Sequence, residues 1–271
     1  MARNKYPQEA KAEGGRPIRL RNPLTPQNFA QELYLESLRN KPITITNGPA
    51  GSGKTFVVTG VALEKLLNKE VDKIVFTRPV VEADEELGFL PGTLEDKLDP
   101  YLKPLFDAVQ DHVGPAMSKK LLESGQIEIA PLAYMRGRTF NHAFVVLDEA
   151  QNSTVKQMKM FLTRIGYGSF YTVNGDVTQS DLKIPRDVDK ATWEHGLTYA
   201  IRKLAGKSEN ISFIEFYNKD VVRSDMCKEV LTYLDAPDER RVVNIDREKP
   251  IQRRHSFNEP AIFTPQTGTD D

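Results

Sequence analysis

The chain has 271 residues, 39% of them hydrophobic, so it is long enough to bury a core of ordinary density. Its 37 lysines and arginines nearly balance its 38 aspartates and glutamates, and a net charge of -1 gives no basis for binding nucleic acid or membrane over the whole surface. A single cysteine, Cys227, excludes an internal disulfide framework, and no apolar run approaches the roughly 20 residues that span a bilayer. We therefore expect a cytoplasmic protein without a membrane partner.

Composition divides the sequence into three parts. Residues 1–23 are polar and basic without helical or strand periodicity, and we interpret them as a flexible basic arm. Residues 237–271 turn polar again, with several arginines and scattered prolines, and we interpret them as a disordered tail. Residues 24–236 between them should form one globular domain.

Within residues 24–236, short apolar runs rich in β-branched residues alternate with stretches of helical periodicity. This alternation predicts an α/β fold in which helices cover both faces of a mostly parallel sheet. The expected strands are residues 42–46, 73–77, 126–130, 143–147, 170–174 and 211–216. The expected helices are residues 26–39, 54–68, 98–111, 154–165, 193–204 and 224–234.

The first predicted strand runs into a glycine-rich turn, GPAGSGKT, and then into a helix, which is the context of a P-loop or Walker A motif. Gly48, Gly51 and Gly53 let the backbone curl so that its amide N–H groups face phosphate oxygens. Lys54 should reach the β and γ phosphates, and the Thr55 hydroxyl should ligate Mg²⁺. The predicted nucleotide-binding residues are therefore Gly48, Pro49, Ala50, Gly51, Ser52, Gly53, Lys54 and Thr55.

The run FVVLDEAQN joins a buried-strand pattern to two carboxylates at its carboxyl end, the edge at which open parallel sheets bind ligands. Asp148 is the Walker B candidate that holds Mg²⁺ through water, and Glu149 is the candidate general base. A solvated strand end or a helix cap is the alternative. Gln179, which follows the next strand in YTVNGDVTQ, is predicted to contact the γ phosphate and the attacking water, although GDVTQ by itself also fits a turn.

Besides the P-loop, seven segments make the sequence similar to the PhoH family of phosphate-starvation-associated ATPases over about residues 24–234. These segments are TRPVVEADEELGFLPG, DPYLKPLFD, YMRGRTF, LDEAQN, QMKMFLTRIG, NGDVTQSDL and DVVRS. The resemblance implies a single RecA-like domain related to the first ATPase domain of superfamily I helicases. It also implies that Gln31, in TPQNFAQELY, contacts the edge of adenine.

Hydrolysis in this class usually needs an arginine beside the γ phosphate, whose effect on the rate is about 10³ to 10⁵ where it has been tested. Two-domain helicases supply this arginine from a second domain. Here it is expected from the same domain or from a neighbouring subunit, which favours a ring or another head-to-tail homo-oligomer. Arg223 in DVVRS is the first candidate for this arginine, and the other candidates are Arg164, Arg136, Arg138 and Arg78. For any of them the alternative is a structural salt bridge or an exposed helix end.

Guanidinium and aromatic groups alternate in YMRGRTF. Arg136 and Arg138 lie beside Tyr134 and Phe140, a mixture suited to backbone and base contacts with single-stranded RNA or DNA. The same residues could form a tight turn at Gly137 that braces the next strand, which is the interpretation we favour.

Arg78 lies near the start of TRPVVEADEELGFLPG, where related helicases place a loop that contacts nucleic acid. The acidic residues that follow it would repel phosphate, so a protein or intersubunit contact is favoured there. Arg78 and Arg164 are kept as candidates for a nucleic-acid or intersubunit contact.

Taken together, the residues and the resemblance predict an ATPase that binds ATP with Mg²⁺, hydrolyses it, and acts on RNA or single-stranded DNA. The alternative is a nucleotide-gated oligomeric regulatory or scaffold protein with slow hydrolysis and no nucleic-acid substrate. A small-molecule kinase is a third hypothesis, but the carboxylate pair and GDVTQ indicate water as the acceptor. The four dispersed histidines have no metal-ligand spacing, so Mg²⁺ is the metal that we expect.

Overall fold

The computed structural model describes residues 20–21, 23–80, 94–184, 188–190, 192–223 and 225–234. The chain divides into two units, residues 1–228 and 229–271, and the second is described only over residues 229–234. The predicted tail and most of the predicted arm thus lie outside the described residues. Within the described ranges, none of the helices is both long enough and apolar enough to cross a bilayer.

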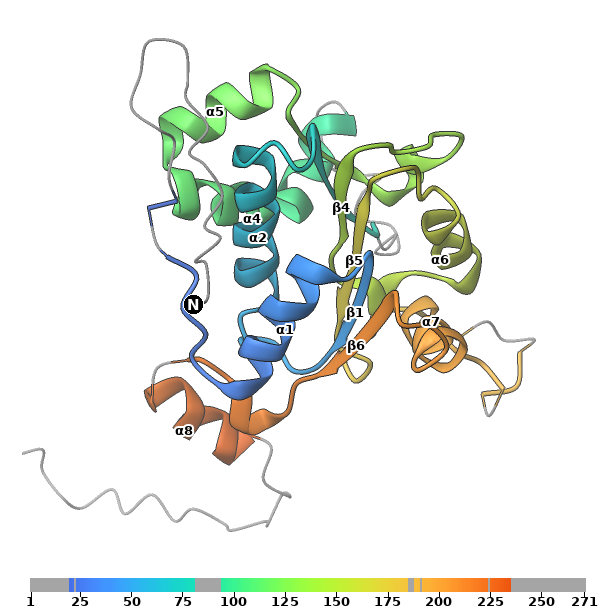
Figure 1. Cartoon of the computed structure of the whole chain (residues 1–271). Helices are drawn as coiled ribbons and strands as arrows, with labels where there is room; N and C mark the ends of the chain where they lie inside the picture. Colours follow the sequence, from blue (N-terminus) through green and yellow to red (C-terminus); the bar gives the residue numbers. More distant parts are fainter. Residues whose placement is uncertain are drawn as a thin grey trace, which may run out of the picture. The chain divides into compact units, whose positions relative to one another are not determined.

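The first unit is built on a six-stranded sheet with the strand order β3-β2-β4-β5-β1-β6, of which β4, β5, β1 and β6 are labelled in Figure 1. Each of its strand pairs is parallel, so the carboxyl ends of all these strands lie along one edge. The strands agree with the predicted ones to within one residue at each end, and the parallel sheet confirms the predicted α/β fold class. Their bounds are Ile43–Asn47 (β1), Lys73–Arg78 (β2), Ile127–Pro131 (β3), Ala143–Leu147 (β4), Phe170–Gly175 (β5) and Ile211–Glu215 (β6).

Helices cover both faces of this sheet (Figure 1). One face carries α1 (Phe29–Asn40), α2 (Lys54–Leu67), α4 (Leu94–Val113) and α5 (Pro115–Glu123). The other face carries α6 (Val155–Leu162) and α7 (Gly196–Leu204). The other elements of the described residues are η1 (Leu132–Met135), η2 (Ala150–Asn152), η3 (Asn218–Asp220) and α8 (Asp225–Leu234).

Helix α5 is absent from the sequence-based prediction. Its short sequence follows Gly114 and opens with Pro115, and a glycine–proline pair usually indicates a turn or loop. Proline is nevertheless favourable in the first turn of a helix, where its missing N–H group has no partner to lose. Here the pair ends α4 and begins α5.

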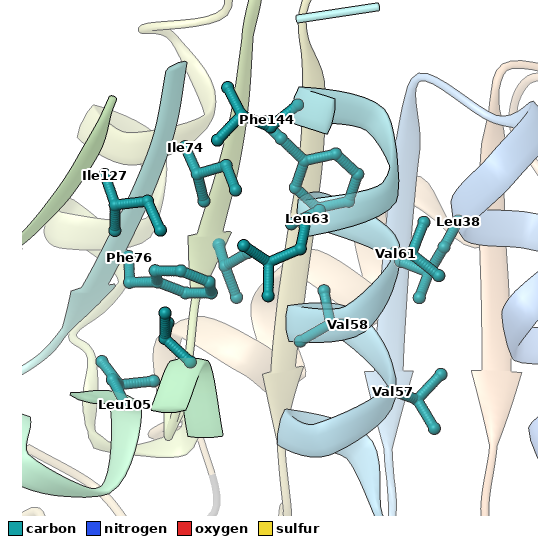
Figure 2. Packing of buried hydrophobic residues seen from close by; sticks show 14 of the residues in the cluster. Leu38, Val57, Val58, Val61, Leu63, Ile74, Phe76, Leu105, Ile127 and Phe144 are labelled. Atoms are coloured by element: carbon teal, nitrogen blue, oxygen red, sulfur yellow. The ribbon is translucent and has the colours of Figure 1, made fainter. Parts of the chain in front are cut away.

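Apolar side chains on both faces explain why the strand sequences read as continuous hydrophobic runs. On the α2 face, Ile74, Phe76 and Phe144 meet Val58 and Leu63 in one buried cluster (Figure 2). Successive residues of a strand point to opposite faces, so a second buried cluster faces α6 and α7. Burying each large apolar side chain contributes about 1.5–3 kcal/mol, and both clusters therefore hold the sheet rigid.

A buried hydrogen-bond network joins α1 to the end of β1. The hydroxyl groups of Tyr34 and Thr46 donate to Oδ1 of Asn174, at 2.7 and 2.8 Å. Burial raises the pKa of Tyr34 far above its usual range, which keeps the hydroxyl protonated as a donor. The network fixes α1 against the carboxyl ends of β5 and β1, the latter just before Gly48.

A charged cluster braces the edge strand β3. The Arg138 guanidinium forks onto Glu128, with Nη1–Oε1 and Nη2–Oε2 distances of 2.5 and 2.8 Å, and Lys73 Nζ lies 2.5 Å from Oε2. The Arg138 guanidinium also lies 4.6 Å from the centre of the Phe140 ring. The hydrogen bonds from Arg138 lower the pKa of Glu128 from its ordinary 4.5 to about 2.

We predict that Glu128→Gln lowers the free energy of unfolding by about 1–2 kcal/mol at pH 7, a figure reduced for the partial exposure of the cluster. Because the folded-state pKa of this carboxyl is depressed, its contribution is present above pH 4.5 and is lost as pH falls toward 2. Urea unfolding of both proteins at a series of pH values measures the difference. Glu123→Gln, which alters an exposed pair with Lys119, is the control. A difference that stays constant down to pH 2 would contradict the assignment.

Candidate active site

The glycine-rich turn between β1 and α2 closes around a lysine. Gly51 and Gly53 have φ angles of +83° and +81°, which L side chains rarely adopt. The Lys54 ammonium donates to the carbonyl oxygens of Gly48 and Pro49 at 2.6 and 2.9 Å. Burial lowers the pKa of Lys54, an effect that nearby carboxylates, Asp148 first, oppose.

Thr55, the next residue, joins the turn to the carboxyl end of β4. Its Oγ1 lies 3.2 and 3.3 Å from the two carboxylate oxygens of Asp148, which is buried. A hydroxyl that donates its proton to Asp148 keeps its lone pairs for a metal ion. These hard oxygen donors fit Mg²⁺. Among the described residues, no three His, Cys, Asp or Glu side chains gather as a group that could hold a metal ion.

Arg78, at the end of β2, lies against the same carboxylates. Its Nη2 is 2.8 Å from Asp148 Oδ2 and 3.6 Å from Glu149 Oε1, and its Nη1 donates to the carbonyl of Tyr101 in α4 at 3.0 Å. The side chain is only 14% exposed. Contact of Arg78 with nucleic acid or another subunit stays a prediction. The acidic residues between positions 82 and 86, which favoured a protein contact there, lie outside the described residues.

Glu149 has a left-handed backbone, with φ 51° and ψ 42°. A non-glycine residue in this conformation costs about 1–2 kcal/mol, and such strain clusters at functional sites. The amide of Gln151 donates to Glu149 Oε2 at 2.7 Å and accepts from the backbone N–H of Asp176 at 3.0 Å. This buried glutamine therefore links Glu149 to the loop after β5.

Gln151 was not among the predicted site residues. It is part of LDEAQN, yet neither spacing nor periodicity indicates that its side chain turns inward to bridge two strand ends.

The loop after β5 turns at Asp176. Its Oδ1 accepts from the N–H and hydroxyl of Thr178 at 2.9 and 2.7 Å, and its backbone carbonyl accepts from the Gln179 N–H at 3.1 Å. The exposed Gln179 thereby faces a cavity of about 260 Å³. This one cavity brings together the predicted residues Ala50, Gly51, Gly53, Lys54, Thr55, Asp148, Glu149 and Gln179.

Arg223 of the same chain lies on the glycine turn. The Val222 N–H donates to the carbonyl of Gly51 at 2.8 Å, and a Cβ atom added to Gly51 would stand 2.2 Å from Arg223 Nε. The guanidinium also donates to the Cys227 sulfur at 3.7 Å. Gly51 thus accommodates the arginine as well as the sharp turn.

Gln31 braces the turn from the side of α1. Its Nε2 donates to the carbonyl of Ser52 at 3.0 Å, and its Oε1 accepts from the Gln27 N–H at 2.9 Å. Both amide atoms are thus engaged within the chain, and the contact with adenine stays a prediction. The residue borders a cavity of about 250 Å³ whose wall also includes Phe56 and Val222.

Three predicted arginines lie away from these cavities. Arg138 forms a salt bridge with Glu128 of the edge strand β3, whereas the brace expected for it was against the following strand, β4. Arg164 Nη1 donates to the Arg138 carbonyl at 3.4 Å. Arg136 is exposed beside the half-exposed Tyr134, and its guanidinium has no hydrogen bond within the described part of the chain. The roles of all three in binding nucleic acid or a neighbouring subunit stay predictions.

Comparison with known proteins gives one family match over most of the sequence. A family model described as PhoH-like protein matches residues 23–235. Protein PhoH of Escherichia coli K12 is 44% identical over 212 residues, which cover 78% of this chain and 58% of that protein. The PhoH-like protein of Bacillus subtilis is 46% identical over 77% of this chain and 63% of its own length. The PhoH-like protein of Mycobacterium tuberculosis H37Rv is 47% identical over 77% of this chain and 57% of its own length. The chain thus spans about three fifths of these relatives.

Solved structures are more distant. The large terminase of a thermophilic bacteriophage aligns with a TM-score of 0.46 and 13% identity, over 79% of this chain and 52% of its own. The Pif1 helicase of Candida albicans aligns with a TM-score of 0.35 and 13% identity, over 72% of this chain and 41% of the helicase. The family match extends over both the sheet and the cavity that collects the glycine turn and the two carboxylates, and the chain belongs to the PhoH-like protein family.

Proposed function

We propose that this chain binds ATP with Mg²⁺ and hydrolyses it. The observation that carries the proposal is the single cavity bordered by Lys54, Thr55, Asp148, Glu149 and Gln179. It combines a glycine turn and a cation for phosphates, oxygen ligands for a divalent ion, and a carboxylate for water.

Binding would use two neighbouring cavities. The triphosphate lies along the turn from Gly48 to Thr55, where backbone N–H groups and the amino end of α2 attract anions. The base enters the cavity bordered by Gln31, Phe56 and Val222. Gln31 contacts adenine there by exchanging its bond with the Gln27 N–H for one with the base.

Bound Mg²⁺ would neutralise charge on the phosphates, and Thr55 and Asp148 would hold it. Glu149 accepts the proton of a water molecule whose oxygen attacks the γ phosphorus, and the bond to the bridging oxygen breaks to leave ADP and phosphate. The Glu149 side chain is 45% exposed, so water reaches it. Gln151 holds Oε2 of this carboxylate and thereby orients it.

Gln179 and Arg223 complete the proposed machinery. Gln179, on the loop that Gln151 ties to Glu149, orients the attacking water and senses the γ phosphate. Arg223 neutralises the charge that develops on that phosphate. Its contact with Gly51 of its own chain supports an arginine supplied within one subunit.

We further propose that hydrolysis serves an action on RNA or single-stranded DNA by a homo-oligomer. The exposed pair of Tyr134 and Arg136 supports this substrate class, because an aromatic ring and a guanidinium together bind bases and phosphates without sequence preference.

Substitution of the two chemically distinct groups should separate binding from turnover. We predict that Lys54→Ala weakens ATP binding, whereas Glu149→Gln binds ATP within about threefold of wild type but hydrolyses it about 10² to 10⁴ times more slowly. Equilibrium binding and steady-state phosphate release measure these quantities. The exposed residues Lys119 and Glu123 provide matched controls, Lys119→Ala and Glu123→Gln. Full turnover by Glu149→Gln would show that another group is the base.

Arg223→Gln should lower kcat about 10³-fold with little effect on ATP affinity, because the arginine acts on charge formed in the transition state. Arg202→Gln removes an exposed arginine and is the control. An equimolar mixture of Arg223→Gln and Lys54→Ala subunits tests the source of the arginine. Recovery of activity in the mixture would mean that the arginine comes from a neighbouring subunit.

Addition of single-stranded RNA or DNA should raise the rate of ATP hydrolysis, and Arg136→Gln should reduce that stimulation while leaving the unstimulated rate unchanged. The measurement is phosphate release at increasing nucleic-acid concentration and at two salt concentrations, since contacts with phosphates weaken with salt. A rate of ATP hydrolysis that neither RNA nor DNA changes would favour the alternative, a nucleotide-gated scaffold protein.

A further inference from the structure

We infer that Arg78 competes with Mg²⁺ for Asp148: its guanidinium is the counter-charge of the catalytic carboxylates when the ion is absent, and it weakens Mg²⁺ binding. The inference rests on the proposed function and adds to it a positioning residue that sets the magnesium requirement.

The position of Arg78 is fixed by the sheet. β2 and β4 are neighbours, Thr77 is the register partner of Leu147, and the Asp148 N–H donates to the Thr77 carbonyl at 2.9 Å. Arg78 and Asp148 are therefore the next pair of residues, just where the two strands reach the edge of the sheet. Backbone register thus places the two residues side by side, and Arg78 Nη2 lies 2.8 Å from Asp148 Oδ2.

The contact is also largely shielded from water. The Asp148 side chain is 4% exposed and the Arg78 side chain 14%. Charges screened this little interact more strongly than surface pairs. The second anchor of Arg78, the Tyr101 carbonyl, keeps the guanidinium beside Asp148 even if an arriving cation loosens the first.

The charges determine the direction of the effect. Asp148, Glu149 and Arg78 together carry a net charge of −1, and without the arginine they would carry −2. A divalent ion held by Thr55 and Asp148 would lie beside the guanidinium, and like charges repel. Arg78 therefore lowers the affinity of the site for Mg²⁺. If Arg78 only held Asp148 in position, its loss would have the opposite effect. Asp148 would then become more mobile, and the affinity for Mg²⁺ would fall.

The test measures ADP binding by calorimetry over a wide range of free Mg²⁺, because ADP avoids turnover. Mg²⁺ should increase the affinity for ADP, and the quantity to compare is the free Mg²⁺ concentration at which half of this increase is reached. That concentration should be about tenfold lower in Arg78→Gln than in the wild type, whereas Arg78→Lys, which keeps the charge, should stay near the wild-type value. Arg202→Gln is the control for loss of an arginine at an exposed pair. A circular dichroism spectrum like that of the wild type verifies that the variants are folded.

An unchanged or raised Mg²⁺ requirement in Arg78→Gln would overturn the inference and leave the proposed function intact. Absence of ADP binding by the wild-type chain would overturn both. If Arg78→Gln is unstable in EDTA, Mg²⁺ should restore its melting temperature, because the ion replaces the lost counter-charge. Instability that Mg²⁺ does not relieve would indicate a structural brace and overturn the inference.

Discussion

The parallel register of β1, β4 and β5 is the constraint on which the candidate site depends. It brings the ends of three strands that are far apart in sequence to one edge, so that the glycine turn, the two carboxylates and the Asp176 loop face each other. The register holds because both faces of these strands are buried under helices. A one-residue slip would exchange the side chains of the two faces, and the close packing of each face against its helices opposes it.

Polar contacts then convert this edge into a connected site. Thr55 ties the turn to β4, and Gln151 ties Glu149 to the loop after β5. The left-handed backbone of Glu149 is held in place by its neighbours, since the residue by itself would relax. Local strain is thus sustained by contacts made across the sheet.

Much of this arrangement can be predicted from sequence, because its signals are local. Buried strands reveal themselves as apolar runs, and the turn GPAGSGKT carries its own geometry. Side-chain contacts between distant segments leave no such signal. Arg78 meets Asp148 across seventy residues of sequence, and the inward turns of Gln151 and Gln31 depend on backbone groups that only the fold brings near. Helix α5 was missed for a local reason, since glycine followed by proline resembles a break.

The network of Tyr34, Asn174 and Thr46 couples two parts of the molecule that would otherwise move separately. Helix α1 carries Gln31, which holds the Ser52 carbonyl of the glycine turn, and Tyr34, which is tied to β5 and β1 below that turn. The helix is therefore joined to the turn through Gln31 and to the strand ends beside the turn through Tyr34. A ligand that shifts α1 by filling the cavity beside Gln31 must also shift the glycine turn. The molecule bound in that cavity therefore affects the position of the turn in the neighbouring cavity, which Lys54 and Asp148 border.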